Sequence, residues 1–248
     1  MQVGFKSDKG LRRSNNEDAC FVLLPDKVYV VADGVGGGNA GEIASRTAVN
    51  EIANYVVDNP ISKLNNKYAV VNYLQDCIDR ANGKIFDMAH TYQENSGMAT
   101  TLSLVHVTAG KAFIANVGDS RAYLFRSGQL TQLTEDHTYV NSLVKAGILT
   151  PEEAAHDERK NVITKAMGAE RNVEPDFFQV DILEGDIILM CTDGLYDEVT
   201  DEEIAEVLDD GLTMSAVCAE LVLRANLNGG HDNITAVSLR VMEEDIHG

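Results

Sequence analysis

The 248-residue chain lacks any long apolar run, and its first residues lack the apolar stretch of a signal peptide. A membrane-spanning helix needs about 20 predominantly apolar residues, so the sequence predicts neither a membrane anchor nor a membrane partner. We therefore expect a cytoplasmic protein. Hydrophobic residues nevertheless make up 44% of the chain, which allows a substantial buried core.

Cysteine is scarce and widely spaced, occurring only at Cys20, Cys77, Cys191 and Cys218. No Cys-x-x-Cys pair is present, which argues against a zinc ribbon and against a dense disulfide framework. We expect these four side chains to be reduced, buried thiols.

Basic residues are also few. The 20 Lys and Arg residues face 39 Asp and Glu residues, which gives a formal net charge of −19. Binding to nucleic acid depends mainly on basic side chains that contact phosphate, so we expect no nucleic-acid partner. The acidic surface could favour basic protein substrates, but a solvated acidic surface is the better explanation of the composition.

No convincing side-chain nucleophile is present. Residues 118–122 fail the Gly-x-Ser-x-Gly pattern at its last position. Cys218 and Arg224 have the Cys-x5-Arg spacing of cysteine phosphatases, but the residues between them follow a helical pattern without glycine. N–H groups inside a helix are already hydrogen-bonded, so no phosphate-binding nest can form there. We interpret the spacing as coincidence.

A glycine-rich loop at residues 34–38 follows a short apolar strand pattern at 28–32. Its spacing nearly matches the Gly-x-Gly-x-x-Gly motif of dinucleotide-binding proteins, but Asn39 takes the sixth place. Asp33 would also point its charge at a bound pyrophosphate unless a cation lay between them. Nucleotide binding is therefore disfavoured, while a purely structural turn remains open.

Four aspartates lie where predicted strands end or turns begin: Asp33, Asp119, Asp193 and Asp232. Each one alone is more often a turn residue or a helix cap than a ligand. As a set, they are the oxygen ligands that Mg²⁺ and Mn²⁺ prefer. The four together therefore predict a metal centre.

Two arginines, Arg12 and Arg13, precede the acidic pair Glu17 and Asp18. The cluster could be a surface ion-pair network of little energetic value. It could equally be an arginine clamp on a phosphoryl group beside a metal ion. The sequence leaves both interpretations open.

Strand and helix patterns are grouped in blocks rather than alternating regularly, which predicts an α+β fold with antiparallel sheets. Apolar spacing predicts helices at 40–57, 67–92 (interrupted by Gly83), 138–146, 151–155, 201–208 and 214–227. Short apolar segments predict strands at 2–6, 18–24, 28–32, 100–108, 111–117, 122–126, 129–133, 177–182, 187–191 and 234–241.

The strands that begin at Val28 and Ile187 are apolar on both faces, so we expect two stacked sheets with helices packed outside. The segment 100–133 is predicted to be a meander of neighbouring antiparallel strands. No low-complexity linker interrupts the chain, and residues 1–248 are therefore expected to form a single domain.

Short motifs along nearly the whole chain resemble the metal-dependent protein phosphatase family, the type 2C Ser/Thr phosphatases, in its compact bacterial form. These motifs lie at residues 13–18, 31–34, 40–42, 97–101, 117–121, 133–137, 161–164, 192–194 and 232–235. The resemblance implies a four-layer αββα sandwich of two antiparallel β-sheets flanked by helices. It also implies two or three Mn²⁺ or Mg²⁺ ions at one end of that sandwich.

The resemblance assigns the metal ligands position by position. Asp33 would bridge two ions, and Gly34 would add its carbonyl oxygen. Asp193 and Asp232 would complete the first ion site, while Asp119 would hold a third ion together with Asp193.

The resemblance also implies the substrate-binding groups and the reaction. Arg13 would bind the substrate phosphate, Glu17 and Asp18 would orient metal-bound waters, and residues 138–159 would form a mobile flap. A metal-activated water would hydrolyse phosphoserine and phosphothreonine in proteins, reversing Ser/Thr kinase signalling. The implied partners are phosphorylated proteins, including a Ser/Thr kinase, and the protein is expected to be a monomer.

One position departs from the pattern of many bacterial members. Their loop after Asp-Gly carries a histidine that can protonate the leaving alkoxide, whereas this chain has Gly38 there. The general acid is therefore unassigned, with His137 and a metal-bound water as candidates. The departure keeps open a module that binds phosphoproteins without turnover. A two-metal phosphodiesterase is disfavoured because the chain has so few basic residues.

Overall fold

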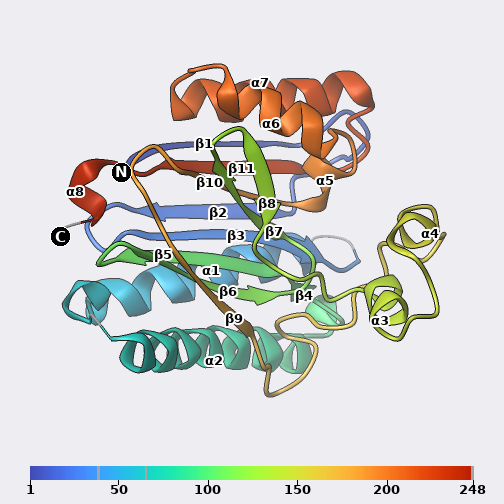
Figure 1. Ribbon diagram of the computed structural model, residues 1–248. Coiled ribbons are helices and arrows are strands. Elements are labelled where there is room, and N and C mark those ends of the chain that lie inside the picture. The colour runs from blue at the N-terminus through green and yellow to red at the C-terminus, as the bar shows by residue number, and fades with distance from the viewer. Residues whose placement is uncertain (38–39, 65, 247–248) are drawn as a thin grey trace.

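Two antiparallel β-sheets stacked face to face form the centre of the molecule (Figure 1). The computed structural model describes residues 1–37, 40–64 and 66–246. Its strands are β1 (Gln2–Asp8), β2 (Asp18–Leu23), β3 (Val28–Val35), β4 (Ala99–Thr100), β5 (Leu102–Thr108), β6 (Lys111–Val117), β7 (Arg121–Arg126), β8 (Gln129–Gln132), β9 (Asp176–Asp181), β10 (Ile187–Cys191) and β11 (Ile234–Arg240). One sheet has the order β1-β11-β10-β7-β8 and the other β2-β3-β5-β6-β9, with β4 paired to β3.

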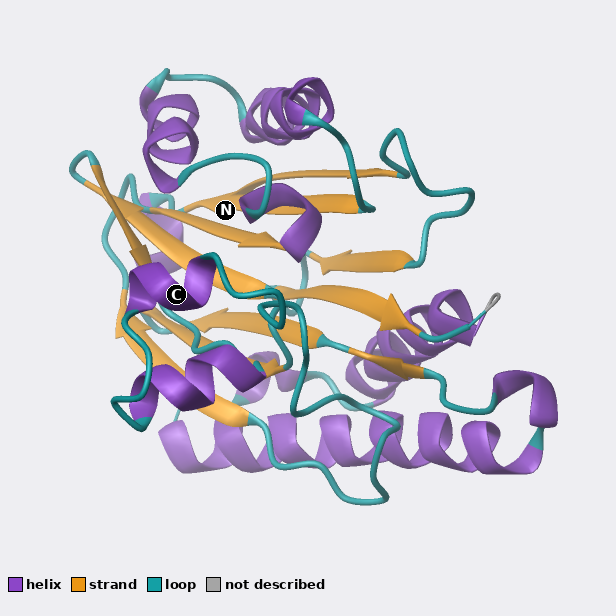
Figure 2. Cartoon of the chain, turned by 90° about the vertical axis from the view of Figure 1, so that its right-hand side faces the viewer, coloured by secondary structure: helices purple, strands orange, loops and turns teal. Residues whose placement is uncertain are grey.

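Helices cover the outer face of each sheet, so the described part of the chain has the predicted four layers (Figures 1 and 2). The helices are α1 (Ala40–Asp58), α2 (Lys67–Thr91), α3 (Tyr139–Lys145), α4 (Pro151–Ala155), α5 (Asp193–Tyr196), α6 (Asp201–Asp209), α7 (Met214–Asn228) and α8 (Glu243–Ile246), with 3-10 turns at Ile61–Lys63 and Gln93–Asn95. α1 and α2 pack on the sheet that contains β3, and α6 and α7 pack on the sheet that contains β10. None of the helices in these ranges is both long and apolar enough to cross a membrane.

Strand β3 shows why the sandwich needs cover on both sides. Val28, Val30 and Ala32 face the helices α1 and α2, whereas Tyr29 and Val31 face the opposite sheet. Successive side chains of a strand point to opposite faces, so an uninterrupted apolar run must be buried twice. The prediction of two stacked sheets with helices outside is confirmed.

The predicted meander over 100–133 is wrong as a single unit. β6 pairs with β5 and β9, whereas β7 pairs with β8 and β10, so the chain changes sheets between β6 and β7. Strands of both sheets are buried and apolar, and their pattern therefore does not reveal which sheet they join. The crossing takes place at the turn that carries Asp119.

Two helices can be compared with the sequence pattern in more detail. The helix predicted at 67–92 is confirmed as α2, and Gly83 lies within it without ending it. Residues 193–196, which the sequence indicated only as a turn, form the short helix α5, so Asp193 occupies a first helical turn.

A segment with α3 and α4 stands apart from the sandwich, where the flap was expected (Figure 1). It leaves the core after His137 and returns at Thr164, whose N–H donates to the His137 carbonyl at 2.8 Å. Thr138 and Ile163 form a bridge just beyond this contact. These backbone contacts make a narrow neck between the segment and the core.

Candidate metal centre

The fold gathers the predicted acids at one end of the sandwich. Burial raises the pKa of Asp33 well above its ordinary value, and the charges of Asp18, Asp193, Asp119 and Asp232 raise it further. These residues come from β2, β3, the β6–β7 turn, the start of α5 and the loop before β11. Only the tertiary fold brings them together.

The electrostatics of this cluster are unfavourable to several negative charges at once. Burial raises the pKa of Asp18 to about 7, and also that of Asp119 to about 7 with a further contribution from Asp193. Burial followed by the charge of Asp232 raises the pKa of Asp193 to about 6. Carboxylates close together in a low-dielectric setting favour a compensating cation or a proton.

Within this cluster, two buried carboxylate oxygens lack a hydrogen-bond partner among the described residues, Oδ1 of Asp18 and Oδ1 of Asp193. Such atoms fit a hard cation, which takes oxygen ligands. Within the same described ranges, however, no three His, Cys, Asp or Glu groups form a ready-made metal site.

The backbone around Asp33 is held on both sides. Its N–H donates to Thr101 Oγ1 at 2.9 Å, and its carbonyl accepts from Thr101 N at 2.9 Å and Thr100 Oγ1 at 2.8 Å. The next N–H, of Gly34, donates to the Glu17 carbonyl at 3.1 Å. A Cβ on Gly34 would lie 2.1 Å from the Gly41 carbonyl oxygen, so α1 approaches too closely for any other residue there.

A hydrogen bond links Asp18 to the segment that carries Asp193. Thr192 Oγ1 donates to Asp18 Oδ2 at 2.9 Å, and Asp18 is buried. Glu17 is less buried, and Asn15 Nδ2 donates to its Oε1 at 3.2 Å. The predicted water-orienting pair thus lies beside the acids, with one member inside the cluster and the other at its edge.

Arg13 contacts the cluster through a residue that lies far from it in the sequence. Its Nη2 donates to Asp232 Oδ2 at 2.6 Å, and half of the arginine side chain stays exposed. The ion-pair interpretation therefore holds for Arg13, but its partner is Asp232 rather than the neighbouring Glu17 or Asp18. A guanidinium with further donors facing outward can also accept a phosphate.

Comparison with known proteins identifies the family of this chain. The family model of protein phosphatase 2C matches residues 11–229. The chain belongs to the protein phosphatase 2C family. It is 36% identical over 248 residues to the protein phosphatase PhpP of Streptococcus pneumoniae, covering 99% of each chain.

Solved structures of phosphatase 2C relatives superpose closely. The Mycobacterium tuberculosis serine/threonine phosphatase PstP/Ppp gives a TM-score of 0.89 at 33% identity, covering 98% of this chain and 99% of the other. A structure of the PstP catalytic domain in complex with two manganese ions gives a TM-score of 0.85 at 34% identity, covering 98% of both chains. The αββα architecture expected from the resemblance is thereby confirmed.

His137 is not free to act as the general acid in this phosphatase 2C chain. Its Nδ1 accepts the Gly118 N–H at 3.0 Å, and its Nε2 lies 3.1 Å from Asp176 Oδ2. The side chain is only 8% exposed. This geometry argues against the suggestion that His137 protonates the leaving group. Gly38, the position that departs from the family pattern, lies outside the described residues.

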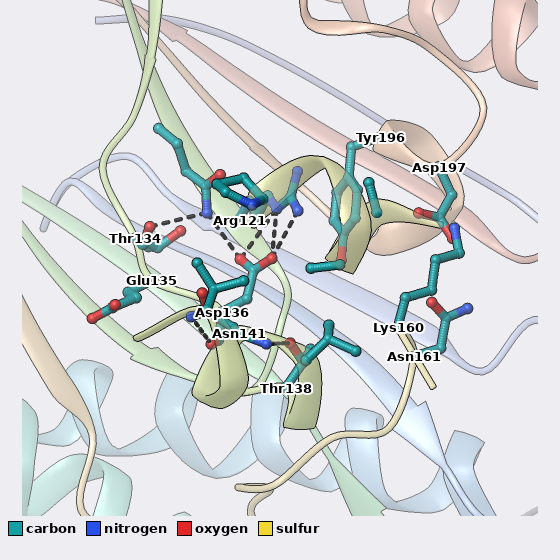
Figure 3. A pocket seen from close by; sticks show the side chains of 16 residues that line it. Arg121, Thr134, Glu135, Asp136, Thr138, Asn141, Lys160, Asn161, Tyr196 and Asp197 are labelled. Carbon is teal, nitrogen blue, oxygen red and sulfur yellow. Dashed lines mark hydrogen bonds and ion pairs between the residues drawn. The ribbon is translucent and has the colours of Figure 1, made fainter. Parts of the chain in front are cut away.

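A cavity of about 600 Å³ lies beside the acid cluster, between the flap and the core (Figure 3). Arg121 and Asp136 form an ion pair on its core side, and Lys160 of the flap pairs with Asp197 at 2.8 Å. The Tyr196 ring also lines it, and its hydroxyl donates to the Asp119 carbonyl at 3.0 Å. None of the predicted metal ligands lines this cavity, so it adjoins the site rather than containing it.

Sequence reasoning missed the residues that hold the acids in place. Thr101 and Tyr196 bond to the backbone of Asp33 and Asp119, but hydroxyl side chains are too common for their positions to stand out. The family motif at 97–101 includes Thr101 and was the one available indication.

Proposed function

We propose that this serine/threonine protein phosphatase hydrolyses phosphoserine and phosphothreonine in proteins with Mn²⁺ or Mg²⁺ ions held by its cluster of aspartates. The gathering of buried, mutually repelling carboxylates at one end of the sandwich carries this proposal. Asp33 would be shared by two ions, Gly34 would contribute its carbonyl, and Asp193 and Asp232 would complete the first site. Asp119 would hold a third ion with Asp193.

The bound ions would lower the pKa of a water molecule enough to supply hydroxide near neutral pH. The other groups belong to the chain itself. Arg13 would bind the phosphate through the guanidinium donors that Asp232 does not occupy, and so would orient it for in-line attack. Asp18 and Glu17 would accept hydrogen bonds from waters at the site, Asp18 through its unpartnered Oδ1.

The substrates are phosphorylated proteins, and we propose that a Ser/Thr kinase is among them, so that the enzyme reverses kinase signalling. We further propose that residues 1–248 act as one phosphatase domain and as a monomer. The net charge of −19 favours phosphorylated segments with basic residues over nucleic acids.

The proposal is tested by hydrolysis of a phosphothreonine peptide after removal of metal with EDTA and again after addition of Mn²⁺ or Mg²⁺. We expect no turnover with EDTA and recovery with either ion, and the two titrations will identify the preferred metal. A phosphodiester serves as the comparison substrate. Full activity in EDTA would refute the metal centre, and faster cleavage of the diester than of the peptide would refute the phosphomonoester specificity.

A further inference from the structure

The hydroxyl group of Thr101 lies between two segments that carry predicted metal ligands. Thr101 is fully buried between β4 and β5. Its Oγ1 accepts the N–H of Asp33 at 2.9 Å and lies 2.7 Å from Oγ of Ser120, the residue after Asp119. One side-chain atom therefore contacts the backbone of one acid and the neighbour of another.

The hydrogen-bonding capacity of a hydroxyl group allows both contacts at once. A threonine hydroxyl has one proton and two acceptor lone pairs. The backbone N–H of Asp33 can only donate, so it uses one lone pair of Thr101. The proton and the second lone pair of Thr101 remain available, so its hydroxyl can either donate to Ser120 or accept from it. A valine in place of Thr101 would keep the shape and lose both contacts.

Packing reinforces the contact on the other side of Asp119. Gly118 has a φ of +96°, and a Cβ on it would lie 2.7 Å from Thr101 Cγ2. The methyl group of Thr101 thus lies against the residue before Asp119, and its hydroxyl bonds to the residue after it.

Asp119 lies in the turn between β6 and β7. The other hydrogen bonds described below for this turn go to residues outside the Asp33 strand end. Gly118 exchanges hydrogen bonds with His137, at the neck of the flap, and the Asp119 carbonyl accepts from Tyr196 of α5. Thr101 is the residue that joins the turn to the strand end of Asp33. This matters because the turn crosses from one sheet to the other and is not held to β3 by strand pairing.

We propose that Thr101 is a positioning residue that sets Asp33 and Asp119 relative to each other, so that the ions they hold bind as a coupled set. This inference rests on the proposed metal centre. Loss of the hydroxyl would leave the Asp33 N–H buried without a partner and would free the Asp119 turn. A shift of about 1 Å in a ligand is enough to weaken a preorganised site.

The test measures Mn²⁺ binding by calorimetry on the full chain, with Thr101→Val, Thr101→Ser and Ser120→Ala. We expect Thr101→Val to weaken Mn²⁺ binding roughly tenfold or more, because two hydrogen bonds are lost and the loss of one typically costs about three- to tenfold. Ser120→Ala should weaken the ion held by Asp119 most, because it frees that turn and leaves the Asp33 N–H bonded to Thr101. Thr101→Ser should return binding to within about twofold of wild type, because it restores the hydroxyl.

A matched control and a metal-free readout separate positioning from general stability. Ser103 is buried on β5, and its hydroxyl has no partner in the described residues, so Ser103→Ala should leave Mn²⁺ binding unchanged. Amide hydrogen exchange of Asp33 in metal-free protein should become faster in Thr101→Val and stay slow in Ser103→Ala. Ser120→Ala should have no further effect on Mn²⁺ binding in an Asp119→Asn background.

Each outcome has a distinct meaning. Wild-type Mn²⁺ binding in both Thr101→Val and Ser120→Ala would overturn the inference, as would failure of Thr101→Ser to restore binding. If Thr101→Val does not fold, Ser120→Ala and its cycle with Asp119→Asn decide the question. If the wild-type protein binds no Mn²⁺, the proposed metal centre fails instead, and exchange of the Asp33 amide alone decides whether Thr101 fixes that strand end.

Discussion

Asp18 and Asp33 lie directly opposite each other in the antiparallel β2–β3 hairpin. Like charges in this arrangement destabilise a sheet, and burial raises the pKa of Asp18 to about 7 and that of Asp33 well above its ordinary value. The pair therefore weakens the fold and favours a bound cation.

The first prediction concerns the proposed ligand Asp193. Asp193→Asn should lower kcat on a phosphothreonine peptide by orders of magnitude because the ion loses a charged ligand. The fold should survive, since the substitution removes repulsion with Asp232. Steady-state kinetics with circular dichroism check both points. The control Asp209→Asn, on the exposed end of α6, should keep full activity. A fully active Asp193→Asn would contradict the assignment.

The second prediction concerns the pH dependence of the metal-free protein. The pKa of Asp18 is raised from 3.8 to about 7, so the folded state binds more protons than the unfolded state between these values. The contribution of Asp18 to stability is therefore lost as pH rises from about 4 to about 7.

Asp18→Asn should remove this loss while keeping an acceptor for Thr192. Urea unfolding in EDTA at pH 5 to 8 should show the variant gaining stability over wild type as pH rises. Equal pH slopes for the two proteins would show that Asp18 is not held in its neutral form.

The third prediction concerns His106, whose pKa is lowered, whereas that of Asp18 is raised. Burial lowers the pKa of this fully buried side chain from 6.5 to about 4. The unfolded state then binds more protons between these values, so stability is lost as pH falls from about 6.5 to about 4. This lowering of the His106 pKa corresponds to a loss of about 3 kcal/mol in the free energy of unfolding.

His106→Asn keeps a donor for the Lys27 carbonyl but does not titrate. Urea unfolding between pH 4 and 7 should therefore show a smaller acid-induced loss of stability in the variant. A loss as large as that of wild type would assign the acid sensitivity to other groups.

The fourth prediction is that Cys218 is a packing residue. It is buried on α7 with its Sγ 3.1 Å from Ser238 Oγ, and burial raises the pKa of its thiol to about 11. A nucleophilic cysteine needs a lowered pKa, so Cys218→Ser should leave kcat within a few-fold. It should cost some stability in thermal unfolding because a hydroxyl replaces a buried thiol. Inactivation of a well-folded variant would revive the cysteine-phosphatase interpretation.

The fifth prediction concerns the leaving group and rests on the sequence, because Gly38 lies outside the described residues. A positioned general acid is typically worth ~10²–10⁴-fold for a poor leaving group such as an alkoxide. This protein should therefore favour aryl phosphates over phosphothreonine peptides, and Gly38→His should narrow the difference in kcat/KM.

His137 provides the contrasting measurement. Its Nδ1 accepts the Gly118 N–H, and its buried Nε2 faces Asp176 at 3.1 Å, so the acid limb of the pH–rate profile should persist in His137→Ala. Disappearance of that limb would identify His137 as the acid despite its contacts with Gly118 and Asp176.

Local patterns were enough to predict most elements and the identity of the acids. The apolar run of β3 and the helical spacing of α1 and α2 are short-range properties, and burial of the strand on both faces required a layered sandwich. Asp33 and Asp193 stood out because each follows a buried strand. One aspartate by itself indicates only a turn. The series of motifs along the chain, in their order and spacing, identified the family.

The tertiary structure decided what the local pattern leaves open. Buried strands look alike in either sheet, so the change of sheet between β6 and β7 was not predictable from apolar spacing. Residues distant in the chain provide the hydrogen-bond partners of Arg13, His137 and Thr101, which bond to Asp232, Gly118 and Asp33 respectively. A sequence records which groups are available, whereas hydrogen-bond geometry and mutual repulsion arise only when folding brings those groups within a few ångströms of each other.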